Sequence, residues 1–159
     1  MKVAYTAHRR LADQDLDTIN NRITQIVLMP EIDEMIFGGA NGGDSHALRF
    51  AARARKQHNR ELKLTVVCPD TLAALPMLAR GWAQQFADQY FELRNPIRQE
   101  DGWASFDLRN RFMVDRVAGQ GWLDAFWSGR KPSGTWNAIQ YAISCGVPWV
   151  HIPIIGADT

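Results

Sequence analysis

The chain has 159 residues, of which 46% are hydrophobic and 22% charged, with 18 lysines and arginines against 17 aspartates and glutamates. This composition is typical of a domain with a single hydrophobic core and excludes a disordered, repetitive or fibrous chain. No apolar run approaches the roughly 20 residues of a membrane helix, so we expect no membrane partner. The net charge of +1 provides no global field for a polyanion, which argues against nucleic acid as a partner unless a local basic patch binds it.

Cysteine usage and the start of the chain favour a cytoplasmic protein. Cys68 and Cys145 are far apart and outside any CxxC spacing, which indicates neither a disulfide framework nor a zinc knuckle. The first ten residues lack the pattern of an export signal. Sequence spacing places no third ligand beside Asp44 and His46, so we expect neither a metal nor a cofactor.

Short β-type segments alternate with helical ones along the chain. Six strands are predicted, at Lys2–Tyr5, Glu34–Phe37, Lys63–Val67, Gln89–Leu93, Leu123–Trp127 and Val147–Ile152. Apolar spacings of three and four, with Pro and Gly as stops, predict helices over Leu16–Ile26, from Ala47, over Thr71–Ala87 in pieces, over Arg109–Ala118 and over Thr135–Cys145. Because parallel strands need crossovers, we expect a single Rossmann-like α/β domain over residues 1–159, with about six parallel strands and helices on both faces.

Four glycines in six residues follow the second predicted strand, in the segment Gly38-Gly39-Ala40-Asn41-Gly42-Gly43-Asp44. A turn without Cβ atoms that opens a helix can offer free backbone N–H groups to an anion, which predicts a phosphate-binding loop. The alternative is a tight turn whose glycines only satisfy positive φ angles. Neither the P-loop pattern nor GxGxxG fits this segment.

Two further segments carry groups suited to phosphate. Ser128-Gly129-Arg130-Lys131-Pro132-Ser133-Gly134-Thr135 leaves the fifth predicted strand and opens a helix, where hydroxyls can either cap N–H groups or contact a phosphate. Arg109 and Asn110, at the predicted start of another helix, can offer a planar bidentate donor and an amide to phosphates or base edges.

In this order, GGANGGD, RNRFMVD and SGRKPSGTWNAIQYAISCGVPW resemble the motifs of the SLOG superfamily. These Rossmann-like proteins include the DNA-processing protein A group, the YspA-like proteins and the LOG phosphoribohydrolases. The resemblance covers nearly the whole chain and is strongest to the DNA-processing-A-like and YspA-like branch. It implies a nucleotide-derived small molecule, such as a nucleoside monophosphate or an ADP-ribose-like compound, bound at two glycine-rich helix N-termini.

The resemblance assigns ligand binding to nine residues, which are Gly38, Gly39, Gly42, Asp44, Arg109, Asn110, Ser133, Gly134 and Thr135. Gly43, in the same glycine-rich turn, is a tenth predicted ligand contact. Four more are candidate contacts. Thr6, His8 and Arg9 lie where related proteins often carry a TGxR-like turn, with Ala7 in place of the glycine, and Trp136 follows the third motif. Two other tryptophans, Trp103 and Trp122, flank a glycine-containing region that we expect to form a lid or the contact of a homo-oligomer.

The resemblance to LOG enzymes argues against catalysis of their reaction. Arg109 stands in the position of their arginine, but Ala138 replaces their glutamate, which leaves Asp44 as the candidate catalytic carboxylate. The sequence therefore predicts a sensor, carrier or sequestering module rather than an enzyme. Two alternatives stay open. One is a LOG-like nucleotide N-glycosidic or phosphate hydrolase that uses Arg109 and Asp44, and the other is nucleic-acid binding of the DNA-processing-A type.

Overall fold

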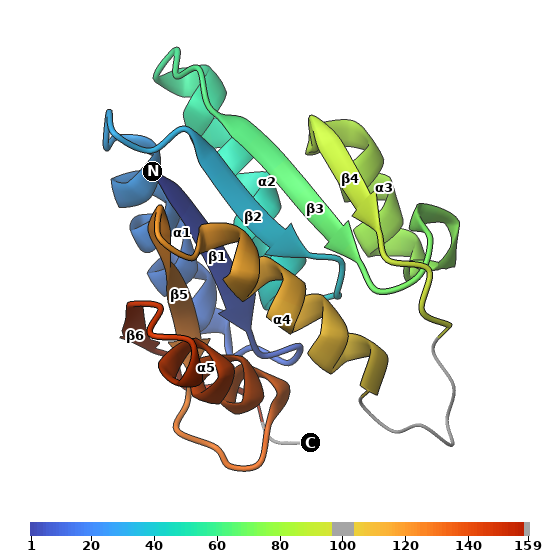
Figure 1. The fold of residues 1–159 in the computed structure, drawn as a ribbon. Helices are drawn as coiled ribbons and strands as arrows, with labels where there is room; N and C mark the ends of the chain where they lie inside the picture. Colours follow the sequence, from blue (N-terminus) through green and yellow to red (C-terminus); the bar gives the residue numbers. More distant parts are fainter. Residues whose placement is uncertain (97–103, 158–159) are drawn as a thin grey trace.

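The computed structural model describes residues 1–96 and 104–157, which form a six-stranded, all-parallel sheet (Figure 1). The strand order is β4-β3-β2-β1-β5-β6. The strands are β1 (Lys2–Ala7), β2 (Glu34–Gly38), β3 (Lys63–Cys68), β4 (Gln89–Glu92), β5 (Gly121–Trp127) and β6 (Trp149–Pro153). All six overlap the predicted segments, and the predicted Rossmann-like α/β class is confirmed.

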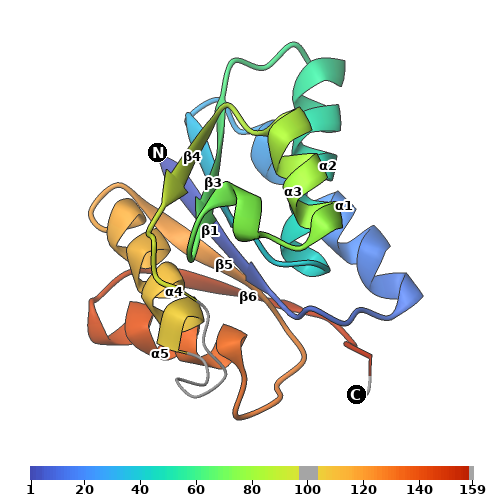
Figure 2. The ribbon, with the colours of Figure 1, turned by 90° about the vertical axis from the view of Figure 1, so that its right-hand side faces the viewer.

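Helices cover both faces of this sheet (Figure 2). They are α1 (Asp13–Val27), α2 (Gly43–Gln57), the short 3₁₀ helix η1 (Leu72–Ala74), α3 (Met77–Phe86), α4 (Ala104–Val117) and α5 (Gly134–Ser144). The helices α1, α2 and α3 lie on one face, and α4 and α5 lie on the other. No helix in the described part of the chain combines the length and apolarity needed to cross a membrane.

Helix α4 begins at Ala104, so the predicted helix start at Arg109 is wrong. The first turn of α4 escaped prediction because its buried residue is the polar Ser105, whose hydroxyl donates to the Pro96 carbonyl at 3.0 Å. Arg109 therefore lies inside the helix, where it is buried.

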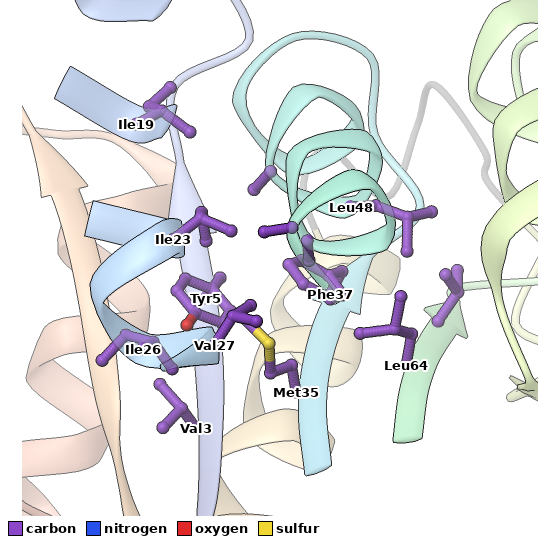
Figure 3. Packing of buried hydrophobic residues seen from close by; sticks show 14 of the residues in the cluster. Val3, Tyr5, Ile19, Ile23, Ile26, Val27, Met35, Phe37, Leu48 and Leu64 are labelled. Carbon is purple, nitrogen blue, oxygen red and sulfur yellow. The ribbon is translucent and has the colours of Figure 1, made fainter. Parts of the chain in front are cut away.

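The core between α1, α2 and the sheet follows the predicted apolar stripe (Figure 3). Ile19, Ile23 and Ile26 on α1 are fully buried. They share this core with Tyr5 and Phe37, whose rings stack with centroids 5.0 Å apart. Burial of each large apolar side chain contributes about 1.5–3 kcal/mol, so this layer holds α1 firmly against the sheet.

An ion pair also ties α1 to β5. The Arg22 guanidinium donates through Nε and Nη2 to both carboxylate oxygens of Asp124, at 2.7 and 3.0 Å. Asp124 is fully buried and also accepts from the indole N–H of Trp122 at 2.8 Å. Trp122 is thus engaged within the sheet layer, whereas Trp103 lies outside the described residues.

We expect Arg22→Ala to lower the free energy of unfolding by about 3–5 kcal/mol, because it leaves the Asp124 carboxylate buried without its cation. Urea unfolding measures this loss. Arg53→Ala, at an exposed position of α2, is the control and should change stability by less than about 0.5 kcal/mol. A loss below about 1 kcal/mol in Arg22→Ala would contradict the importance of this pair.

Candidate functional site

The strand order changes direction between β1 and β5. The chain builds β2, β3 and β4 outward on one side of β1 and then returns to place β5 on its other side. In open parallel sheets, ligands bind beyond the carboxyl ends of the strands at such a switch point. The loops that follow β1 and β5 lie together at this end of the sheet (Figure 1). The candidate site is therefore the carboxyl edge of β1, β2 and β5.

Glycines let the β2–α2 turn approach the β1–α1 loop. Gly42 has a φ of 92°, and a Cβ there would lie 2.0 Å from the Arg9 carbonyl oxygen. A Cβ on Gly43 would lie 2.2 Å from the Cβ of Ala7. Any side chain at these positions must therefore displace the backbone of the neighbouring loop.

Two of the N–H groups that the sequence suggested for anion binding serve the fold. The N–H of Gly39 donates to the Val67 carbonyl at 3.2 Å, and that of Gly43 donates to the His8 carbonyl at 3.1 Å. The alternative reading of the segment as a tight turn thus accounts for much of its glycine content.

A buried carboxylate and a buried guanidinium lie beside Gly38. A Cβ on Gly38 would be 2.6 Å from Asp44 Oδ2 and 3.0 Å from Arg109 Cζ. Asp44 lies in the first turn of α2, two residues after the N-cap Gly42. Asp44 Oδ1 and Arg109 Nη1 are buried and have no hydrogen-bond partner among the described residues. Such unsatisfied polar atoms in a native structure require an explanation, and an exchangeable ligand is one.

Burial controls the ionisation of this pair. It raises the pKa of Asp44 to about 6, although the positive charges of Arg109 and Arg9 act in the opposite direction. Burial also lowers the pKa of Arg109, against the favourable charge of Asp44. The Asp44 carboxyl group therefore titrates near pH 6.

Residues at the start of α5 itself satisfy part of the hydrogen-bonding capacity at its N-terminus. The Ser133 hydroxyl caps the helix by accepting from the Trp136 N–H at 3.0 Å, and Thr135 is buried. The Asn110 side chain is also buried and donates to the Gly134 carbonyl at 3.4 Å. Asn110 thereby connects α4 to the start of α5.

His8 connects the two loops at the switch point. Its Nε2 accepts from the backbone N–H of Ser128 at 3.1 Å and lies 3.0 Å from the Ser128 hydroxyl. Burial and then the charge of Arg130 lower the pKa of His8 below 6.5, which favours the neutral ring at neutral pH. Thr6 lies buried within β1 rather than in a turn. Neither residue presents a positive charge to a ligand.

Cations over aromatic rings border the site. Arg9 Cζ lies 4.3 Å from the centroid of the Phe106 ring, and Arg109 Cζ lies 5.5 Å from it. Across the switch point, Lys131 Nζ lies 3.8 Å from the centroid of Trp136. The sequence reasoning missed Phe106 because it belongs to the overlooked first turn of α4, although an aromatic residue three positions before Arg109 was a usable signal.

A pocket of about 230 Å³ opens beside the Arg9 and Phe106 pair. Its other walls come from the β2–α2 turn and the segment around η1, and its polar members include Asn41, Asp70 and Thr71. Within residues 1–96 and 104–157, no three histidine, cysteine, aspartate or glutamate side chains gather as a metal site would require.

The loops at the switch point carry more exposed positive charge than the net charge of the chain suggests. Arg9 and Arg10 follow β1, Arg130 and Lys131 follow β5, and all four are exposed. The neighbouring Asp15 is buried, with its carboxylate accepting backbone N–H groups. Four exposed cations therefore lie in the two loops at the switch point, with the exposed Asp13 at the start of α1, in a chain whose formal net charge is +1.

No protein-family model matches the chain, and no curated protein sequence matches it. Among solved structures, it is similar to DNA processing protein A from Helicobacter pylori, whose structure was described for its single-stranded DNA binding mode. The TM-score is 0.65 and the identity 18%, over 95% of this chain and 64% of that one. It is also similar to DNA processing protein A from Streptococcus pneumoniae, with a TM-score of 0.67 and 18% identity, over 94% of this chain and 49% of that one. The chain thus spans less than two thirds of either neighbour and shares their fold.

These neighbours overturn two predictions made from the sequence. The main prediction, a nucleotide-derived small molecule as ligand, is wrong, and so is the argument against nucleic acid as a partner. The finding favours the alternative of the DNA-processing-A type. The physical reason for the error is that the net charge averages over the chain, whereas the exposed cations after β1 and β5 are concentrated at one edge.

Position 138, where LOG enzymes carry their glutamate, is buried in the core. Ala138 is 2% exposed and packs in the core between α4, α5 and the sheet, so this position of α5 offers no room for a carboxylate that could face a ligand. Asp44 is the carboxylate that lies beside Arg109.

We expect Gly43→Ala to destabilise the fold by about 1–3 kcal/mol, because the new methyl group overlaps the side chain of Ala7. Gly81→Ala is the matched control. It lies inside α3 with nothing within 4 Å of a Cβ, so it should stabilise the protein by about 1 kcal/mol. Thermal unfolding compares the two variants, and equal shifts in both would contradict the close approach of the turn.

We expect the stability of Asp44→Asn relative to the unsubstituted protein to increase with pH. The pKa of Asp44 is about 6 in the folded state, above its ordinary value of 3.8. Its stabilising contribution is therefore complete below about pH 3.8 and is lost as the pH rises through 6. The variant cannot ionise, so urea unfolding between these limits should show a relative gain of up to about 3 kcal/mol. Asp17→Asn, exposed on α1, is the control, and a pH-independent difference for Asp44→Asn would contradict the assignment.

Proposed function

We propose that this chain binds single-stranded DNA across the carboxyl edge of its sheet, between the β1–α1 and β5–α5 loops. The observation that carries the proposal is the pairing of cations with aromatic rings on both sides of the switch point. Arg9 lies over Phe106 on one side, and Lys131 lies over Trp136 on the other. Proteins that bind single strands combine a positively charged path for the backbone with aromatic faces on which bases stack. The shared fold with DNA processing protein A supports the same proposal.

The roles of the residues follow from their exposure. Arg10 and Arg130, with Arg9 and Lys131, are placed to contact phosphates from the two loops. Arg109 is the buried cation whose Nη1 has no partner among the described residues, which suits a phosphate that enters beside α2. The four glycines and Asp44 then shape the site, while Ser133 and Thr135 form the start of α5 and Asn110 joins it to α4.

Membership of the SLOG superfamily, through its DNA-processing-A-like branch, is part of this proposal. The order of the glycine turn, the Arg109-Asn110 pair and the Ser133-Gly134-Thr135 segment supports it, and so does the fold. A single domain over residues 1–159, a cytoplasmic location and a homo-oligomeric state remain predictions from the sequence.

The salt dependence of binding tests the proposal. Fluorescence anisotropy with a labelled oligothymidylate should show binding that weakens as salt rises, because phosphate contacts release counterions. Arg10→Ala and Lys131→Ala should each weaken binding and reduce the slope of log K against log salt by about 0.7. A duplex of equal length should bind less tightly, because its bases are not available for stacking.

Lys56→Ala is the matched control, since Lys56 is exposed in the last turn of α2, at the opposite end of that helix from the glycine turn. It should leave both affinity and slope unchanged. If the protein fails to bind the oligothymidylate at low salt, or if Lys56→Ala and Lys131→Ala reduce the slope equally, the proposed site is wrong.

A further inference from the structure

A polar groove of about 410 Å³ lies between α4 and α5 and shares Asn110 with the site described above. Its walls include Asp107, Asn110 and Arg111 from α4, and Asn137, Gln140 and Tyr141 from α5. Spacings of three and four residues place each set on one stripe of its helix. Stripes that face a neighbouring element are normally apolar, so two facing polar stripes need another explanation.

The groove holds hydrogen-bonding groups that the fold does not use. The Gln140 side chain is exposed and makes no hydrogen bond with any described residue. Asn137 donates to Asp107 at 3.3 Å through Nδ2, which leaves its side-chain carbonyl oxygen unbonded among the described residues. The Arg111 guanidinium lies 5.0 Å from the centroid of the Tyr141 ring. Amide donors and acceptors thus stand beside an arginine stacked on an aromatic ring.

Asn110 connects this groove to the proposed DNA path. Its Oδ1 accepts from Arg109 Nε and Nη2 at 3.3 and 3.1 Å, while its Nδ2 donates to the Gly134 carbonyl. Both α4 and α5 start at the carboxyl edge of the sheet and run toward the opposite edge (Figure 1). A DNA strand that crosses the start of α5 can therefore place a base at the end of the groove nearest the carboxyl edge of the sheet.

We infer that the groove between α4 and α5 binds the edges of nucleobases from the same single strand and prefers adenine. This inference rests on the proposed function. Asparagine and glutamine amides match the adjacent amino donor and ring-nitrogen acceptor of adenine. The Arg111 and Tyr141 pair offers a flat face against which such a base can stack. The two amides that face the groove, Asn137 and Gln140, make adenine the best match.

Anisotropy with oligodeoxyadenylate and oligothymidylate of equal length tests the inference. The unsubstituted protein should favour the adenylate. Gln140→Ala should reduce the ratio of the two affinities by about 5- to 150-fold, the range of one bidentate contact, and should leave the salt slope unchanged. Because the stacking of each free oligonucleotide is the same in every measurement, the change in the ratio isolates the side chain. Gln84→Ala, an exposed glutamine on α3, is the matched control and should leave the ratio unchanged.

The outcomes separate this inference from the proposed function. If Lys131→Ala weakens binding but Gln140→Ala leaves the ratio unchanged, the groove does not select bases and the DNA path stands. If Gln140→Ala weakens binding of both oligonucleotides equally, the groove contacts the strand without discriminating adenine, which overturns the inference. If neither oligonucleotide binds the unsubstituted protein, the proposed function is wrong and the inference with it.

Discussion

The close approach of the β2–α2 turn to the β1–α1 loop determines where the charged groups of the site lie. Only glycine at positions 42 and 43 lets the turn lie against the Arg9 carbonyl and the Ala7 side chain. This contact holds the start of α2 against the β1–α1 loop, and Asp44 in the first turn of α2 is buried. The absence of a Cβ on Gly38 leaves room for Arg109 beside Asp44. The raised pKa of Asp44 is thus a consequence of backbone packing.

The loops of the site are held in place by hydrogen bonds within the protein. The Asp15 carboxylate accepts the N–H groups of Ile155 and Gly156, at 2.8 and 2.9 Å, and also that of Ala12 at 2.8 Å. The chain beyond β6 is therefore fastened to the start of α1, while His8 joins the β1–α1 loop to Ser128. Loops ordered in advance lose less conformational entropy on binding, which favours affinity for an extended ligand.

The sequence predicted the fold well because its signals are local. Runs of β-branched residues marked the strands. The predicted division of Thr71–Ala87 occurs at Pro76, which separates η1 from α3, but not at Gly81, which lies inside α3. The proximity of Asp44 and Arg109 could not be predicted from the sequence, because it depends on how the strands are ordered in the sheet. Phe106 was missed because the first turn of α4 buries a polar serine rather than an apolar stripe. The prediction against nucleic acid failed because the net charge is an average over the whole chain. The fold places four exposed cations in the loops at the carboxyl edge of the sheet.

The same geometry couples proton binding to the proposed DNA binding. A phosphate beside Arg109 would lie next to Asp44, and two negative charges at short range in a buried site repel each other strongly. A proton on Asp44 removes that repulsion and leaves the charge of Arg109 uncompensated, so protonation and phosphate binding favour each other. Because the pKa of Asp44 is already about 6, a moderate further increase on binding would bring its protonation into the neutral range. The glycine turn buries Asp44 and so raises its pKa. As a result, ionised Asp44 opposes a bound phosphate, whereas protonated Asp44 permits it.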